Sequence, residues 1–189
     1  MLTHLIKSIN WIDAGMAVLF IRVILVGVKN GFLSEFFKCL GLIVAIFVSL
    51  HYYSYLAALA AQKLHFNWQY WDLLMFVDLW VAVMFFFMLV RYGTLMLFKA
   101  ETIHEGFDKY SGGFLAVVRG ILVCSMAIFT ILLFHHQSLS LMALHSFSFK
   151  IAGHVDVSIY SFLYNHVVDK LFAGEHYNTA AALVLHPAG

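Results

Sequence analysis

Four long apolar runs dominate this sequence, and each is close to the length of a helix that crosses a lipid bilayer. They lie at about residues 11–28, 42–56, 71–90 and 114–134. A helix needs about 20 apolar residues to span a hydrocarbon core of about 30 Å. Only 11% of the 189 residues are charged, too few to cover a water-facing surface. The sequence therefore predicts an all-α polytopic membrane protein with four transmembrane helices plus interfacial amphipathic helices.

The first run contains Arg22, which bears on whether the run is a cleaved signal peptide. A secretory signal peptide has an uncharged hydrophobic core followed by a cleavage site with small residues. This run has a charged residue inside it and no such site after it. We therefore expect the first helix to be retained in the mature protein.

The stretch Gly27–Gly41 joins the first two runs and carries most of the polar residues nearby, so we interpret it as a membrane hairpin turn. If the chain reverses near Lys29, Arg22 and Lys38 lie at a similar depth of roughly 10 Å, because a helix rises 1.5 Å per residue. Glu35 could then bridge the two cations and lower the cost of holding them in a poorly hydrated region. We favour the structural alternative, in which these charges fix the hairpin or extend to the surface.

Three other charged residues fall inside the later runs, of which Asp72 lies at the membrane interface beside Trp71. Asp78 lies well within the third run, and Arg119 lies near the start of the fourth. Ionisable groups within membrane helices are candidates for function by default. For Asp78, a hydrogen bond in helix packing and a role in conduction remain open alternatives.

Small residues recur at every fourth position at the start of the fourth run, namely Gly112, Ala116 and Gly120. In lipid, such a stripe allows another helix to approach closely, since packing drives association there. The stripe predicts a tight helix contact. Gly31 and Gly41, at the first junction, are further candidates for helix packing.

The chain divides into a transmembrane domain at residues 1–134 and an extracytoplasmic amphipathic tail at residues 135–189. Within the first part, Phe98–Tyr110 has acidic residues at helical spacing, which predicts a helix along the membrane surface. The tail is too polar to span. Its residues 155–171 carry one apolar and one polar stripe, so we expect a helix that rests on the membrane or on a partner.

The distribution of basic residues predicts the orientation. Six of them lie on the side of the first-to-second and third-to-fourth connections, namely Lys29, Lys38, Arg91, Lys99, Lys109 and Arg119. The other side holds four, at Lys7, Lys63, Lys150 and Lys170. Basic residues accumulate in the cytoplasm. The excess predicts cytoplasmic connections and a periplasmic location for both termini.

Enzyme signatures are weak in this chain. His104 and Glu105 begin a zinc-protease motif, but Asp108 stands where the second histidine would be needed. No G-x-S-x-G, Walker A or dinucleotide-binding motif occurs. The seven tail histidines lack regular metal-ligand spacing, so a metal or a pH-sensing role is the less favoured reading of them. We predict a protein that is not an enzyme, with no catalytic residue, metal or cofactor, and the net charge of +1 indicates no nucleic-acid partner.

Two segments carry a family resemblance. The first is Trp11-Ile12-Asp13 followed by Gly27-Val28-Lys29-Asn30-Gly31-Phe32-Leu33-Ser34-Glu35 and Leu40-Gly41-Leu42. The second is Phe107-Asp108-Lys109-Tyr110-Ser111-Gly112-Gly113 ending in Val118-Arg119-Gly120. Together they cover about Trp11 to Phe134, and this part of the chain resembles the colicin V production protein family. The resemblance implies a four-helix protein of the bacterial inner membrane, associated with production or export of a peptide toxin and with envelope upkeep.

Two functions from different classes follow. The first is a non-catalytic scaffold that forms a homo-oligomer or binds other membrane proteins within the lipid bilayer, which the small-residue stripe and the tail helix favour. The second is a channel or transporter for a small solute or proton, which Asp78 and the group of Arg22, Glu35 and Lys38 favour. Four spans leave little room for a pore in one protomer, so we expect the scaffold.

Overall fold

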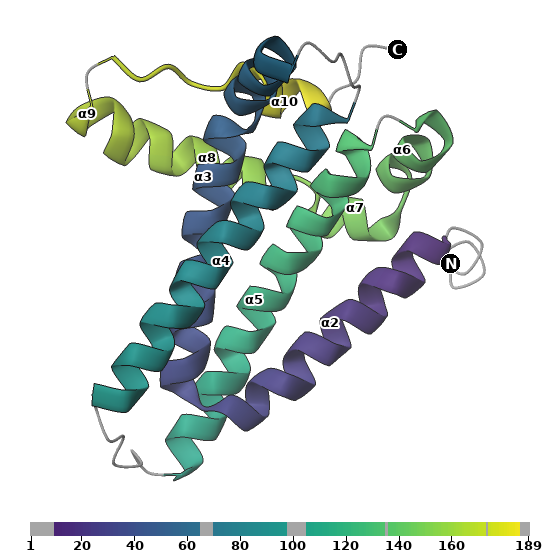
Figure 1. Ribbon diagram of the computed structural model, residues 1–189. Coiled ribbons are helices and arrows are strands. Elements are labelled where there is room, and N and C mark those ends of the chain that lie inside the picture. Colours follow the sequence, from purple (N-terminus) through teal and green to yellow (C-terminus); the bar gives the residue numbers. More distant parts are fainter. Residues whose placement is uncertain (1–9, 65–69, 98–104, 135, 173, 186–189) are drawn as a thin grey trace.

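The computed structural model describes residues 10–64, 70–97, 105–134, 136–172 and 174–185. Four long helices make up most of this part of the chain: α2 (Trp11–Asn30), α3 (Phe32–Leu64), α4 (Trp71–Leu97) and α5 (Glu105–Leu133) (Figure 1). Each is long and apolar enough to cross a membrane. The described residues contain no strand. The predicted all-α fold with four membrane-spanning helices is confirmed.

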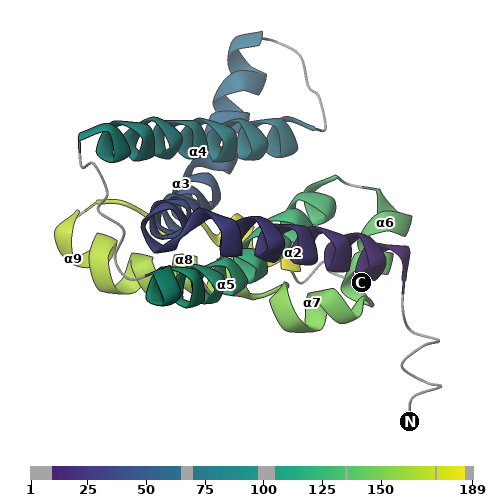
Figure 2. The same ribbon diagram turned by 90° about the horizontal axis from the view of Figure 1, so that it is seen from below.

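The long helices are arranged around α3. It packs against α4 on one side and α5 on the other, while α2 packs mainly against α5. Figure 2 shows the result, with α3 between α4 on one side and α2 and α5 on the other, while α4 also makes a few contacts with α5. Only a small part of α4 is buried, so most of its surface is left to lipid or to a partner.

An aromatic core fills the space where α3, α4 and α5 meet. The rings of Tyr53, Phe76 and Phe129 contact one another, with centroids 5.0 to 6.2 Å apart. All three side chains are buried. Such ring pairs add about 0.5–1.5 kcal/mol each beyond the burial of their area. They fix how α4 sits on the rest of the bundle.

The tail folds back over one end of the bundle. It consists of α6 (Gln137–Leu144), α7 (Phe147–Ala152), α8 (Val155–Leu163), the π-helical turn η1 (Tyr164–Val168), α9 (Asp169–Leu171) and α10 (Thr179–Leu185). Figure 1 shows α8 crossing α3 below its upper end, with α9 pointing outward from the bundle. Helix α8 contacts α3 and α5, and α7 contacts α5. The tail and the bundle therefore share one hydrophobic core.

The predicted hairpin turn is much shorter in the structure than Gly27–Gly41. Helix α2 continues to Asn30 and α3 begins at Phe32, so the reversal takes place at Gly31 alone. The polar residues beyond it lie on the first turns of α3 because their partners are inside the bundle rather than in water. Helix α3 also continues to Leu64, about two turns beyond the end of the second apolar run near residue 56.

The predicted surface helix at Phe98–Tyr110 is wrong in its described part. Residues 105–110 form the first turns of α5 and run without interruption into the span. Residues 98–104 lie outside the described residues. Continuation of the helix satisfies its backbone hydrogen bonds, which a break at the membrane face would leave open.

The tail helix occupies residues 155–171 as expected, but a different face of it is buried. Asp156, Tyr160, Tyr164 and Val168 point into the protein. The predicted apolar stripe is largely outward, with Phe162, Val167 and Leu171 exposed. The reason is that aromatic hydroxyls can be buried once they are hydrogen-bonded. The exposed stripe is left for the membrane or a partner, which stays a prediction.

Candidate functional site: a buried charge cluster at the α2–α3 turn

Gly31 makes the sharp reversal between α2 and α3. Its φ of 75° lies in the left-handed region that residues with a Cβ rarely adopt. A Cβ on this residue would also fall on the carboxylate of Asp108. That carboxylate accepts a hydrogen bond from the backbone N–H of Phe32, with an N···O distance of 2.7 Å. Asp108 thus satisfies an open donor at the start of α3 and ties α5 to the turn.

Glu35, one turn further along α3, is completely buried. Its Oε1 accepts hydrogen bonds from Lys38 Nζ at 2.6 Å and from Asn30 Nδ2 at 3.0 Å. Arg119 Nη1 lies 3.1 Å from its Oε2 and donates towards Oε1 at 3.4 Å. Donors from α2, α3 and α5 therefore surround one carboxylate. The ion pair of Arg119 with Glu35 joins α5 to α3, and the loss of either partner would leave the other charge buried.

Arg119 is anchored at both ends of its guanidinium. Besides Glu35, it donates from Nη2 to the backbone oxygen of Val23 in α2 at 3.1 Å. Its side chain is almost entirely buried. Arginine suits such a position because its planar fork of five donors can serve several acceptors at once. The guanidinium therefore crosslinks α5 to both α2 and α3.

The structure does not bring Arg22 into this cluster. Lys38 contacts Glu35 as we expected, but the second cation is Arg119, and Arg22 lies exposed on α2. The physical reason is the orientation of α2 about its own axis. Val23 and Gly27 lie on the face that meets α5, so Arg22 points elsewhere. A signal for Arg119 was present in the sequence. It stands between Ala116 and Gly120, so it shares the face of closest helix approach.

The small-residue stripe of α5 packs against α2 within the protomer. A Cβ on Gly112 would meet the backbone of Gly31 and Phe32 at 3.0 and 3.2 Å, and one on Gly120 would meet the ring of Phe20 at 2.7 Å. Ala116 faces Gly27, where a Cβ would overlap that of the alanine. The stripe is thus used inside the fold, and it lends no support to contacts between copies.

The remaining predicted site residues lie on α3 and α4. Gly41 faces Phe87 of α4, where a Cβ would lie 2.7 Å from that side chain. Arg91 donates from Nη1 to Ser34 Oγ at 3.1 Å, close to the cluster. Asp78 is exposed on the side of α4 that points away from α3. The structure therefore separates Asp78 from the other charged candidates.

A second polar network, which the sequence did not reveal, holds the tail on α3. His51 is buried, with Nδ1 3.0 Å from the hydroxyl of Tyr160 and Nε2 3.1 Å from Glu175 Oε2. An ionised Glu175 carboxylate only accepts, so His51 Nε2 donates to it. In the neutral ring Nδ1 then accepts from the Tyr160 hydroxyl, whose oxygen also accepts from the backbone N–H of Asn178 at 2.8 Å. The only hint was a histidine within an apolar run.

Asp156 is a third buried polar group, at the contact of α8 with α5. Its backbone N–H donates to Ser125 Oγ at 3.0 Å, and its Oδ1 accepts from Val157 N–H at 2.8 Å. Its Oδ2 has no hydrogen-bond partner among the described residues. Burial raises the pKa of Asp156 to about 7, since a charged carboxylate is poorly solvated there.

The raised pKa of Asp156 predicts a pH-dependent stability. The folded protein keeps a proton that the unfolded chain releases near its ordinary pKa of 3.8, so stability should fall as pH rises from about 4 to about 7 and then level off. Asp156→Asn should remove this dependence and raise the free energy of unfolding at pH 8 by roughly 1–3 kcal/mol. SDS titrations at pH 5 and pH 8 measure it, and Asp169→Asn, on an exposed residue of α9, should behave as the native protein.

The described residues hold no group of three or more side chains suited to bind a metal ion. Two of the seven tail histidines, His135 and His186, lie outside the described residues, and so do His104 and residues 1–9. Cys39 and Cys124 are free and buried. The charged cluster around Glu35 is the main candidate site, and its ion pairs between α3 and α5 suit a structural function better than proton transfer.

Comparison with known proteins gives one result. The family model for the colicin V production protein matches residues 12–157, more than three quarters of the chain. This match continues past Phe134, where the resemblance in the sequence ended, and takes in α6, α7 and the start of α8. No curated protein and no solved structure matches significantly. The chain is a membrane protein that belongs to the colicin V production protein family.

Proposed function

We propose that this protein is a non-catalytic scaffold of the bacterial inner membrane, supporting colicin V production or export and envelope upkeep, and that it works as a homo-oligomer. One observation carries the oligomer. Arg22 and Asp78 both lie within the spans, and both are exposed on helix faces that the protomer leaves uncovered. Charged side chains in membrane helices almost always face protein or a water-filled cavity. A second copy supplies such a surface.

The faces around these two charges are otherwise apolar. On α2, Val18 and Leu25 flank Arg22 and are 68% and 60% exposed. On α4, Phe85 and Leu89 lie along the face of Asp78 and are 56% and 54% exposed. A charge on such a surface costs about 2.5–3.5 kcal/mol at the centre of a membrane helix, and pairing with an opposite charge offsets it. Charge complementarity therefore favours α2 of one copy against α4 of another.

The depths of the two charges are compatible with this pairing. Helices α2 and α4 both begin at a tryptophan, Trp11 and Trp71, and tryptophan collects at the membrane interface. Arg22 follows about three turns later and Asp78 about two, which corresponds to roughly 16 and 11 Å. A flexible arginine side chain covers the difference. In the predicted orientation these tryptophans and both chain termini face the periplasm.

Crosslinking in native membranes tests the arrangement. Two differently tagged copies, one with Leu25→Cys and one with Ala82→Cys, should form a disulfide-linked dimer that carries both tags after mild oxidation. Residues 25 and 82 are exposed one turn past Arg22 and Asp78, whereas Cys39 and Cys124 are buried and should not react. Asp78→Asn should reduce the dimer about fivefold, the effect of losing one interaction of about 1 kcal/mol in the membrane.

A charge exchange identifies the pair. Arg22→Asp alone should reduce the mixed dimer, and Arg22→Asp combined with Asp78→Arg should restore it. Lys150→Asp, which reverses an exposed cation on α7 outside the spans, is the control and should change nothing. Recovery of monomer alone, or a dimer that is indifferent to Asp78→Asn, would exclude this interface.

The channel alternative has no comparable observation in its favour. Glu35 is enclosed by its donors from three helices. Asp78 points outward from α4 and lines no space between helices of the protomer. We therefore do not propose transport for this protein.

A further inference from the structure

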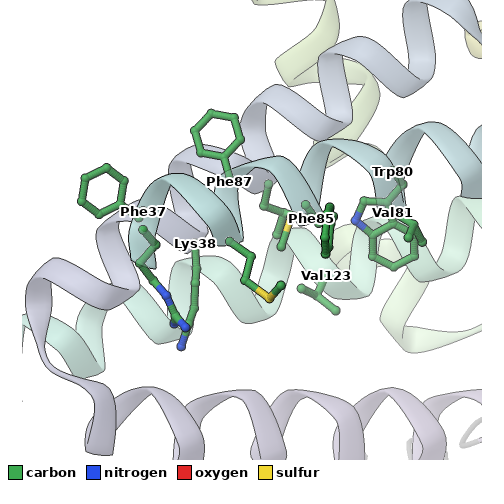
Figure 3. Close-up of a pocket in the computed structure, with 11 residues that line it drawn as sticks. Phe37, Lys38, Trp80, Val81, Phe85, Phe87 and Val123 are labelled. Carbon is green, nitrogen blue, oxygen red and sulfur yellow. The ribbon is translucent and has the colours of Figure 1, made fainter. Parts of the chain in front are cut away.

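A groove with a volume of about 510 Å³ lies between α4 and α5 and runs over α3 (Figure 3). Its wall on α4 extends from Trp80 through Met84 to Arg91, while Leu42 of α3 and Val123 of α5 form the floor and the far side. The lining residues are all apolar except at one end, where Lys38 and Arg91 lie. Figure 3 shows Lys38 at the end away from Trp80.

The length of the groove matches one leaflet of a bilayer. Trp80 and Arg91 are about three helical turns apart, which is roughly 16 Å and about half of the hydrocarbon thickness. The groove is open sideways, because Val81 and Phe85 on its rim are 58% and 56% exposed. An acyl chain can therefore enter from the lipid phase and lie along α4.

The end of the groove at Lys38 and Arg91 has an excess of positive charge. Arg119 lies close by, and Glu35 forms ion pairs with Lys38 and Arg119 but not with Arg91 among the described residues. Lys38 uses one of its three N–H donors on Glu35. Arg91 uses Nη1 on Ser34, and its buried Nε has no hydrogen-bond partner among the described residues. These open donors call for an anionic acceptor.

We propose that this groove binds one molecule of an anionic phospholipid, with a phosphate oxygen between Lys38 and Arg91 and an acyl chain along α4 as far as Trp80. A phosphate there offsets the net charge of the cluster and accepts from the Lys38 donors that Glu35 does not use, and basic pockets between membrane helices are known to hold such headgroups. Arg22 and Asp78 do not line the groove, but Phe85 belongs both to its rim and to the face of α4 in the proposed interface, so a neighbouring copy would border the bound acyl chain.

Quenching of Trp80 by brominated lipid tests the proposal. The full chain is reconstituted in phosphatidylcholine bilayers in which the same small fraction of either phosphatidylglycerol or phosphatidylcholine carries bromine on its acyl chains. The fluorescence of Trp80 is obtained by subtracting the emission of the Trp80→Phe variant from that of the native chain. Brominated phosphatidylglycerol should quench Trp80 several-fold more strongly than brominated phosphatidylcholine.

Variants at the cationic end locate the headgroup. Arg91→Gln should lower the preference for phosphatidylglycerol about fivefold, the effect expected for one basic residue at an anionic bilayer surface. Arg91→Lys should retain most of it. The matched control is Lys29→Gln, which removes an exposed cation at the same end of the bundle but outside the groove. It should keep the preference within about twofold.

Three results would overturn the proposal. Equal quenching by the two lipids would show no headgroup preference, and equal effects of Lys29→Gln and Arg91→Gln would indicate attraction to the general surface. Absence of Trp80 quenching by either lipid would mean that protein fills the groove. Native mass spectrometry of the purified native chain gives an independent measurement that needs no variant. It should show one retained phosphatidylglycerol, and its absence would also contradict the site.

Discussion

Glu35→Ala is expected to lower the free energy of unfolding by roughly 3–5 kcal/mol, the usual effect of removing one partner from a buried ion pair. The carboxylate is completely buried and contacts Lys38, Arg119 and Asn30. Without it, the nearly buried guanidinium of Arg119 has no counter-charge within the bundle. Titration of the purified protein with SDS in mixed micelles, followed by circular dichroism, measures the loss.

Three further variants test the cause. Glu35→Leu combined with Arg119→Leu should lose less than Glu35→Ala alone, because the double change removes the stranded cation together with its partner. Glu35→Gln keeps the volume and one acceptor oxygen, so its loss of stability should lie between those of Glu35→Ala and the double variant. Asp169→Asn removes an exposed carboxylate on α9 and should stay within about 0.5 kcal/mol of the native chain. A loss below about 1 kcal/mol for Glu35→Ala would mean that water reaches the cluster.

The four spans were predictable because a polypeptide in lipid can adopt few backbone structures. A backbone in hydrocarbon must satisfy its own hydrogen bonds, so an apolar run of sufficient length becomes a helix. The apolar runs at residues 11–28 and 71–90 correspond closely to α2 and α4. Hydropathy fails where polar residues turn inward. Polar residues such as Glu35 and Lys38 made Gly27–Gly41 resemble a turn, yet both lie on the first turns of α3 and Glu35 is completely buried.

Partners across helices could be predicted only in part. Glu35 and Lys38 are three residues apart on one helix, so their contact follows from helical geometry. The choice between Arg22 and Arg119 depends on how α2 and α5 are rotated, which periodicity alone does not fix. The contact of His51 with Glu175 joins positions 124 residues apart, and no local pattern announces it.

The buried face of the tail helix shows a related limit. The apolar stripe was expected to face the membrane or a partner, and no pattern in the sequence indicated which residues of the helix would face the bundle. At a membrane surface an apolar side chain can face either the protein or the lipid, since lipid also accepts apolar side chains. Tyr160 and Tyr164 are inside because His51 and the backbone of Glu175 bind their hydroxyls. Their burial depends on partners that the sequence does not place.

Gly27 lies where α2 comes closest to α5, and its substitution is the second change with a large expected effect on stability. Gly27→Ala should destabilise the protein by about 2–3 kcal/mol, although alanine is the better helix former by about 1 kcal/mol. The new methyl group would overlap the Cβ of Ala116 and would lie 3.2 Å from Glu35 Oε2. The two helices must then separate, which also stretches the bonds of Arg119 to Val23 and Glu35.

An exchange of the two residues tests whether contact at this point is the cause. Gly27→Ala combined with Ala116→Gly moves the methyl group from α5 to α2 and should recover more than half of the lost stability, since the nearest atom of residue 116 is then its Cα at 3.3 Å. Gly93→Ala is the matched control on α4, where a Cβ meets nothing within 4 Å. It should leave the SDS midpoint unchanged or raise it. If the exchange recovers nothing, the sensitivity of residue 27 comes from Glu35 and not from the helix crossing, because only the carboxylate contact is common to both variants.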